Sequence, residues 1–111
     1  LVLRGIQTRN RVVISPMCQY SAHEGHMDDW HLVHLGRFAI GGAGIVFTEA
    51  TAVQKAGRIT HGCPGLWCDS QIPSHAKVAQ FALRNGAIPA IQLGHAGRKA
   101  ACSGHGTAMV R

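Results

Sequence analysis

The stretch DWHLVHLGRFAIGGAGIVFTEA (residues 29–50) joins a helical pattern to a strand pattern through a short glycine-rich link. Asp28 and Asp29 are good capping residues for a helix N-terminus, so we predict that a helix begins there. Apolar side chains then recur at helical spacing: Leu32, Leu35 and Ala39. The glycines that follow end the helix, and the nearly continuous apolar run AGIVFTEA (43–50) predicts a strand buried on both faces of a sheet.

Two further apolar runs flank this stretch, RVVISPM (11–17) before it and AIPAIQLGH (87–95) after it. The first also predicts a strand buried on both faces. In the second, Pro89 must lie near the start of the strand, because proline cannot donate a hydrogen bond to a sheet ladder. Both runs are therefore predicted to be strands.

A second helical pattern lies between the last two runs. It follows Asp69 and Ser70, has Pro73 near its first turn, and stops at Asn85-Gly86. Its apolar stripe consists of Val78, Phe81 and Ala82. The order strand, helix, strand, helix, strand predicts an α/β fold with a parallel sheet and right-handed crossovers.

Each apolar run turns polar at its carboxyl end. The residues there are Cys18 and Tyr20, then Thr48 and Glu49, then Gln92 and His95. Parallel α/β folds build their sites at the carboxyl ends of the strands, in open sheets and in closed barrels alike. The sequence therefore predicts a functional site at this edge.

Composition excludes several classes of protein. Apolar residues make up 46% and charged residues 14% of the 111 residues, which is typical of a globular chain. No run of 18 or more apolar residues and no signal-peptide pattern appears, so we expect no membrane contact and a cytoplasmic location with reduced thiols. The net charge of +6 is scattered along the chain, so we expect no nucleic-acid partner.

Motifs for phosphate or metal binding are weak. The glycine-rich GGAG (41–44) precedes a strand, whereas a dinucleotide fingerprint follows one, so we interpret it as a tight loop. The four cysteines contain no CxxC pair, and no metal site is expected. His31 and His34 share a helix face and could ligate a metal, but we favour partly buried packing for both.

The order of five motifs resembles the old yellow enzyme family. They are SPMCQYS, DWHLVHLGRFAIGGAG, FTEATAVQKAGRIT, GLWCD and IQLGHAGRKA. More narrowly, they are similar to the thermophilic-like NADPH-dependent ene-reductases, a group of NADH:flavin oxidoreductases. Cys68 stands where a serine is expected, and the resemblance covers roughly residues 1 to 100.

The resemblance implies the first three βα units of a (β/α)₈ TIM barrel, with residues 1–102 forming the N-terminal part of an FMN-binding barrel. It implies FMN as cofactor and NADPH or NADH as hydride donor. The hydride would pass through the flavin to an activated alkene such as an enone. Full-length relatives of this kind are implied to be homo-oligomers.

The resemblance also assigns site residues. Four consecutive residues would line the flavin: Ser15, Pro16, Met17 and Cys18. Ala50 would let the ring approach because it is small, and Gln92 would offer its amide to the pyrimidine edge. Tyr20 would direct its hydroxyl at the substrate carbonyl. Cys18 and Tyr20 are the predicted catalytic pair.

Two roles are open for Cys18. A thiol beside the flavin could bias the reduction potential through a weak hydrogen bond. Covalent catalysis is the alternative, but no base is identifiable as a partner for the thiol. We favour the tuning role.

The chain is short for a barrel of about 250 residues. We expect it to be the N-terminal portion of the flavoenzyme, and the alternatives are a partial flavin-binding module without turnover and a non-functional truncated product.

Residues 103–111 diverge from the family, which typically continues with a segment like R-P-W-x-G-x-G-P. One permitted codon choice for Gly104 to Val110, when it is read from the last base of the Ser103 codon, encodes R-P-W-H-G-N-G. We therefore predict that this tail is out of frame, through a real frameshift or a sequencing error.

Overall fold

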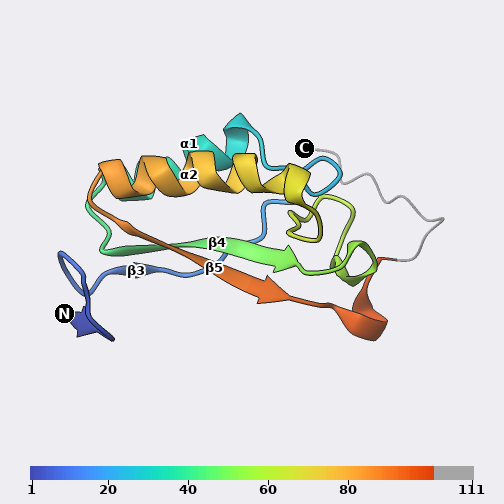
Figure 1. The fold of residues 1–111 in the computed structure, drawn as a ribbon, viewed down its shortest axis with the longest axis horizontal. Coiled ribbons are helices and arrows are strands. Elements are labelled where there is room, and N and C mark those ends of the chain that lie inside the picture. The colour runs from blue at the N-terminus through green and yellow to red at the C-terminus, as the bar shows by residue number, and fades with distance from the viewer. Residues whose placement is uncertain (102–111) are drawn as a thin grey trace.

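A computed structural model describes residues 1–101, and its centre is a three-stranded parallel sheet in the order β3-β4-β5. The strands are β3 (Val13–Ile14), β4 (Ile45–Ala52) and β5 (Ile88–Gly94). The helices α1 (Asp29–Ile40) and α2 (Ile72–Arg84) both cover the same face of this sheet (Figure 1). The predicted order of strands and helices and the parallel sheet are confirmed. The predicted tail at 103–111 lies outside the described residues.

Local sequence explains where the helices begin and end. The Asp28 carboxylate accepts a hydrogen bond from the Trp30 amide, and the His31 side chain reaches back to the Asp28 amide, which completes a capping box. Pro73 lies in the first turn of α2, and Gly86 follows its end with a φ of 83°. The start of α1 is therefore capped as predicted, whereas α2 begins at Ile72 after a 3-10 turn over Asp69–Gln71, and its N-cap residue Gln71 makes no side-chain cap hydrogen bond.

The core lies between the two helices and the covered face of the sheet. Its buried members include Leu35, Ala39, Val46, Val78 and Ala82. Where the helices cross, a Cβ atom on Gly36 of α1 would approach the Phe81 ring of α2 to 2.8 Å. A side chain at position 36 would therefore separate the two helices.

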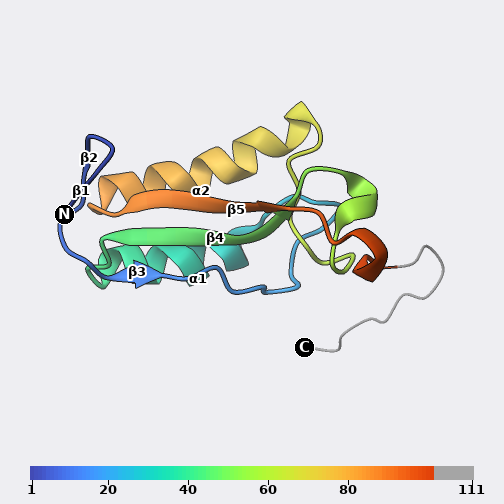
Figure 2. The ribbon, with the colours of Figure 1, turned by 90° about the horizontal axis from the view of Figure 1, so that it is seen from below.

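The expectation that the first strands are buried on both faces is wrong for β3. This strand has two residues rather than seven, and Val13 is 48% exposed. Within residues 1–101, helices cover only one face of the sheet, and β3 and β5 form its edges (Figure 2). Pro89 lies near the start of β5, as predicted.

The sequence did not predict a small hairpin at the N-terminus, β1 (Val2–Leu3) paired with β2 (Ile6–Gln7). Its two-residue turn places Arg4 at φ 45° and Gly5 at φ 82°. Positive φ at both central residues is the requirement of a type I′ turn. Arginine is a weak signal for that turn, which explains why the pattern was missed.

Three 3-10 turns complete the described chain: η1 (Lys55–Gly57), η2 (Asp69–Gln71) and η3 (Gly97–Lys99). The helices found in residues 1–101 are too short and too polar to cross a bilayer.

Candidate functional site

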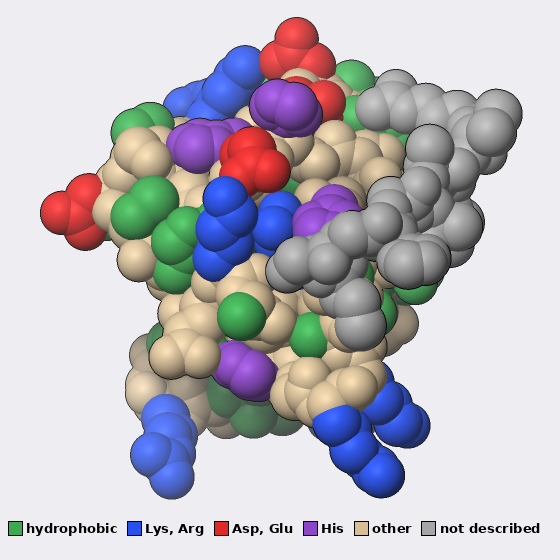
Figure 3. Space-filling model, turned by 90° about the vertical axis from the view of Figure 1, so that its right-hand side faces the viewer, with side chains coloured by type: hydrophobic (Ala, Val, Ile, Leu, Met, Phe, Trp, Pro, Cys, Tyr) green, Lys and Arg blue, Asp and Glu red, His purple; other side chains and the backbone are tan. Residues whose placement is uncertain are grey.

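The carboxyl ends of β4 and β5 bring Ala50 and Gln92 together. The two residues are Cα partners in the parallel ladder. Both line a cavity of about 200 Å³, together with Cys63, Gly94 and His95. Figure 3 views the molecule from this end, where histidines and charged side chains of both signs gather. The sheet edge therefore combines an open space with polar groups.

The segment that follows β3 carries the other predicted residues. Ser15 and Met17 are exposed, whereas Pro16 and Cys18 are half-buried. Because β3 pairs with β4, this segment leaves the sheet at the same end as Ala50. The segment after β3 thus lies at the same end of the sheet as Ala50 and Gln92, but of the predicted site residues only Ala50 and Gln92 line the cavity.

The environment of Cys18 keeps its thiol protonated. Burial raises the pKa of Cys18, and the negative charge of Glu49 and the neighbouring Cys63 raise it further. A thiolate is the nucleophilic form of cysteine, so these surroundings do not activate Cys18. Cys63 is near enough to Cys18 to affect its pKa, and it also lines the cavity. The segment after β3 therefore lies next to that cavity.

Tyr20 has an unusual backbone and an accessible side chain. Its φ of 54° lies in the left-handed region, and the residue is 41% exposed. A Cβ atom on Gly62 would approach the Tyr20 carbonyl oxygen to 2.5 Å, so only glycine allows this close contact. The Ala22 amide also donates a hydrogen bond of 2.9 Å to the Gly62 carbonyl. The loop around Gly62 therefore supports the Tyr20 turn.

Glu49 is a buried carboxyl group at the same edge. It is 3% exposed, and its Oε2 accepts a hydrogen bond of 2.9 Å from the Gln19 amide. Burial raises the pKa of Glu49 to about 7, although the Gln19 and Tyr20 amides oppose this shift. The Nε2 atom of His31 lies 3.5 Å from Glu49 Oε1.

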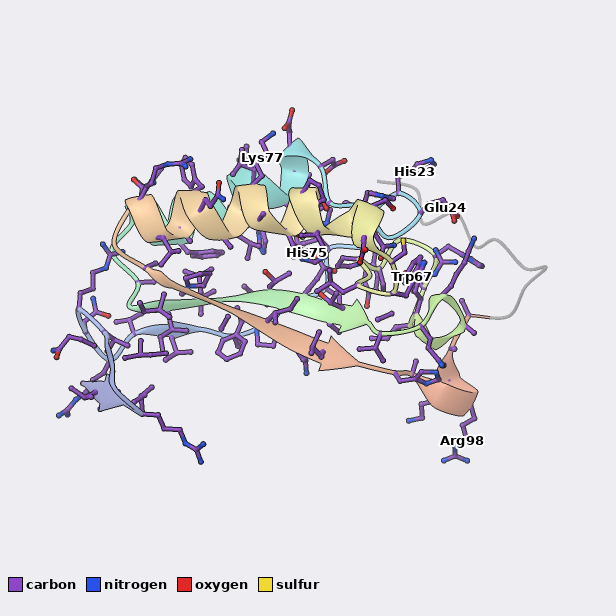
Figure 4. The ribbon with its side chains drawn as sticks, viewed as in Figure 1. His23, Glu24, Trp67, His75, Lys77 and Arg98 are labelled. Carbon is purple, nitrogen blue, oxygen red and sulfur yellow. The ribbon has the colours of Figure 1, made fainter. Side chains whose placement is uncertain are left out.

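The loop after β4 is fixed by buried groups (Figure 4). Cβ atoms on Gly25 and Gly65 would meet the Trp67 ring within 2.5 Å, so the indole fills the space that these glycines leave. The fully buried Gln71 accepts a hydrogen bond of 2.9 Å from the Trp67 amide. The His75 ring lies on the sheet side of α2, 3.1 Å from the Gly65 carbonyl, and its burial lowers its pKa. These contacts hold the loop between β4 and α2 against the start of α2.

His31 and His34 are both buried, at 1% and 8% exposure, which is more than the partial burial expected, and His31 also makes polar contacts with Asp28 and Glu49. The His34 ring packs edge-to-face on Phe38, and burial lowers its pKa. Within residues 1–101, no three side chains of the His, Cys, Asp and Glu types gather as metal ligands.

Sequence reasoning placed Glu49 at the sheet edge but missed its contacts with Gln19 and His31. The available signal was an acid inside the apolar strand IVFTEATA, because a buried carboxyl group needs a hydrogen-bonding partner. The partners themselves lie 30 and 18 positions away in the chain, so no local pattern could identify them.

The parallel sheet, its covering helices and the cavity at the strand ends define the class of parallel α/β proteins. Among solved structures, the chain superposes on a 2-naphthoyl-CoA reductase with a TM-score of 0.87 at 24% identity, covering 91% of this chain and 16% of that one. It superposes on the old yellow enzyme from Pichia sp. AKU4542 with a TM-score of 0.82 at 23% identity, covering 90% and 26%. It also matches morphinone reductase with a TM-score of 0.76 at 27% identity, covering 84% and 24%. The sheet is therefore part of a TIM barrel.

The sequence comparisons identify the family. The profile of the NADH:flavin oxidoreductase / NADH oxidase family matches residues 2–109, so the chain belongs to this family. It is 47% identical over 102 residues to an NADH:flavin oxidoreductase of Gibberella zeae, covering 92% of this chain and 25% of that protein. It is 45% identical over 104 residues to an NADPH dehydrogenase of Listeria monocytogenes, covering 92% and 31%. The chain thus spans between a quarter and a third of these curated relatives.

Proposed function

We propose that this chain supplies the N-terminal part of the FMN site in an NAD(P)H-dependent flavin oxidoreductase, which passes a hydride to an activated alkene such as an enone. The observation that carries the proposal is the pairing of Ala50 with Gln92 at the carboxyl ends of β4 and β5. Membership of the NADH:flavin oxidoreductase family supports it.

The residues at this edge fit a flat ring system. Ala50 offers a methyl group only, and a Cβ atom on Gly94 would meet nothing within 4 Å, so the cavity is open there. The exposed Gln92 side chain carries both a donor and an acceptor, which suits the pyrimidine edge of a flavin. FMN, when bound, supplies the capacity to accept a hydride from NAD(P)H and to deliver it to a substrate.

The segment after β3 serves the reacting part of the site. Ser15, Pro16 and Met17 form the surface beside the ring, and the neutral Cys18 thiol is a weak hydrogen-bond donor that biases the flavin potential. Tyr20 donates its hydroxyl proton to the carbonyl oxygen of the substrate in a hydrogen bond. This bond orients the alkene and withdraws electron density from it.

The test uses a chimera in which residues 1–101 replace the matching segment of the Listeria NADPH dehydrogenase. We expect the chimera to bind FMN and to oxidise NADPH with cyclohexenone as acceptor. Gln92→Leu should weaken FMN binding at least about tenfold, because a buried flavin edge loses its partner. The matched control is Gln7→Leu in the exposed N-terminal hairpin. Equal FMN affinity in both variants would contradict the assignment of Gln92.

Partners and location extend this proposal. We propose a homo-oligomeric whole protein in the cytoplasm, acting on small enones. Support for a reducing compartment comes from Cys18, Cys63 and Cys68, which carry free thiols in the described part of the chain.

A further inference from the structure

Glu49 occupies a bulge in β4. Thr48 pairs with Ile91 and Ala50 pairs with Gln92, so the ladder shifts register across Glu49 and leaves it as the extra residue. A bulge of this kind redirects a side chain relative to the strand alternation. Its neighbour Ala50 lines the cavity, whereas the Glu49 carboxyl group is 3% exposed.

The carboxyl group of Glu49 reaches the segment that carries the proposed site residues. Its Oε2 accepts a hydrogen bond of 2.9 Å from the Gln19 amide, and the adjacent Tyr20 amide lowers the pKa of the same carboxyl group. Gln19 stands directly between Cys18 and Tyr20. One buried group therefore binds the backbone that carries both side chains.

The opposite side of Glu49 faces the start of α1. The Nε2 atom of His31 lies 3.5 Å from Glu49 Oε1, and the His31 ring is 1% exposed. The Nδ1 atom of the same ring lies 3.0 Å from the Asp28 carboxylate, which caps α1. Glu49 thus connects β4, the segment after β3 and the first turn of α1.

The backbone at Tyr20 requires such support. Its φ of 54° is a conformation that residues other than glycine adopt rarely, and it persists only where the surroundings hold it. Glu49 binds this turn from inside the fold, and the loop at Gly62 contacts it from the other side.

We propose that Glu49 is a positioning residue, whose buried carboxyl group holds the backbone of residues 18–20 and so fixes Cys18 and Tyr20 at the sheet edge. The significance for catalysis rests on the proposed flavin function. The positioning itself is a property of this chain and can be measured without flavin.

Titration of Glu49 gives the proposal a measurable signature. Burial raises its pKa from 4.5 to about 7, and the titratable groups beside it are His31, Cys18 and, beyond His31, Asp28. Opening of the segment exposes Glu49 to water, where its pKa is ordinary. The closed segment therefore binds the proton more tightly than the open segment does. The contribution of this proton to the stability of the closed segment is fully present below about pH 4.5 and is lost as the pH rises through about 7.

Amide hydrogen exchange of the flavin-free chimera measures this directly. The quantity is the protection factor at Gln19 and Tyr20, corrected for intrinsic exchange, with the β4 and β5 amides as internal references for the fold. We expect protection at Gln19 and Tyr20 to fall at least about tenfold between pH 5 and pH 7.5. An unprotected Gln19 amide in the unmodified chain, or a flat profile, overturns the proposal.

Three variants separate positioning from packing. Glu49→Gln keeps a neutral acceptor of the same size, so we expect protection within about threefold of the unmodified chain at pH 5 and no pH dependence. Glu49→Ala removes the acceptor and should lose at least tenfold at Gln19. Glu24→Gln makes the same chemical change at an exposed carboxylate and should leave the profile intact. If the pH dependence survives in Glu49→Gln, another titratable group causes it, and the proposal is wrong.

A parallel measurement of FMN binding by the chimera separates the two hypotheses. Exchange results as expected without flavin binding would leave the role of Glu49 standing and remove the flavin function. Flavin binding by the chimera, together with unchanged protection of the Gln19 amide in Glu49→Ala, would support the flavin function and remove the positioning role of Glu49.

Discussion

Burial and the Glu49 charge raise the pKa of the Cys18 thiol, and this favours one of its two proposed roles. A covalent nucleophile needs a lowered pKa or a neighbouring base, whereas a weak donor to a flavin needs a protonated thiol. The electrostatics of the residue thus favour tuning.

Replacing Cys18 with Ala in the chimera should change the flavin reduction potential while FMN stays bound, because the small side chain removes the donor and leaves the rest of the wall. The measurement is a spectroscopic redox titration, with Cys68→Ala as the control at an exposed thiol. Complete loss of flavin from the Cys18 variant would show a structural role instead.

Tyr20 is accessible and held by its backbone, so its hydroxyl can be removed without disturbing the turn. Tyr20→Phe in the chimera should weaken the binding of enone and phenol ligands by about 0.5–1.5 kcal/mol, the value of one neutral hydrogen bond. Ligand titration by flavin absorbance measures the change. Unaltered affinity for both ligand classes would refute the contact.

At the scale of elements, one side chain joins the N-terminal segment to the ends of both helices. Arg9 donates to the carbonyls of Ala39, Ala43 and Asn85 at 2.6 to 3.0 Å. These carbonyls follow or end α1 and α2, where intrahelical partners are missing. Arg9 therefore fixes the helix ends opposite the site.

Arg9→Lys should lower the free energy of unfolding by about 1–2 kcal/mol, because an ammonium group cannot reach all three carbonyls in the fork geometry of guanidinium. Urea unfolding of the chimera, followed by circular dichroism, measures it. Arg4→Lys in the hairpin turn is the matched control, and equal midpoints for the two variants would contradict the role of Arg9.

At the scale of the whole molecule, the described sheet has one uncovered face and two edges. Val13, Met17 and Leu93 are exposed at 48%, 39% and 57%. In the solved relatives, this part covers between 16% and 26% of the chain. Unpaired strand edges recruit other chains, so this architecture favours association.

We predict that the 111-residue chain by itself forms oligomers or aggregates, binds FMN weakly and does not turn over. Size-exclusion chromatography with light scattering and FMN fluorescence titration test both parts. A monomeric, cooperatively unfolding preparation loaded with flavin would prove the prediction wrong.

The reading frame of residues 103–111 is a separate prediction. If the tail is out of frame, the gene read in the shifted frame should encode R-P-W-H-G-N-G at Gly104 to Val110 and then continue into further barrel strands. Sequencing the gene across Ser103 decides this. An intact original frame, with no open shifted frame, would contradict the prediction. The family profile itself extends to residue 109, which lies within this tail.

The sequence by itself determined the order of strands and helices, the helix ends at Asp28 and Gly86, and the gathering of polar residues at the strand ends. These features follow from local periodicity and capping, which act over a few residues. Only the tertiary structure decided the exposed face of β3, the left-handed turn at Tyr20 and the burial of Glu49 against Gln19 and His31. Each of these depends on contacts between segments far apart in the chain, and local patterns carry no information about which distant groups will meet.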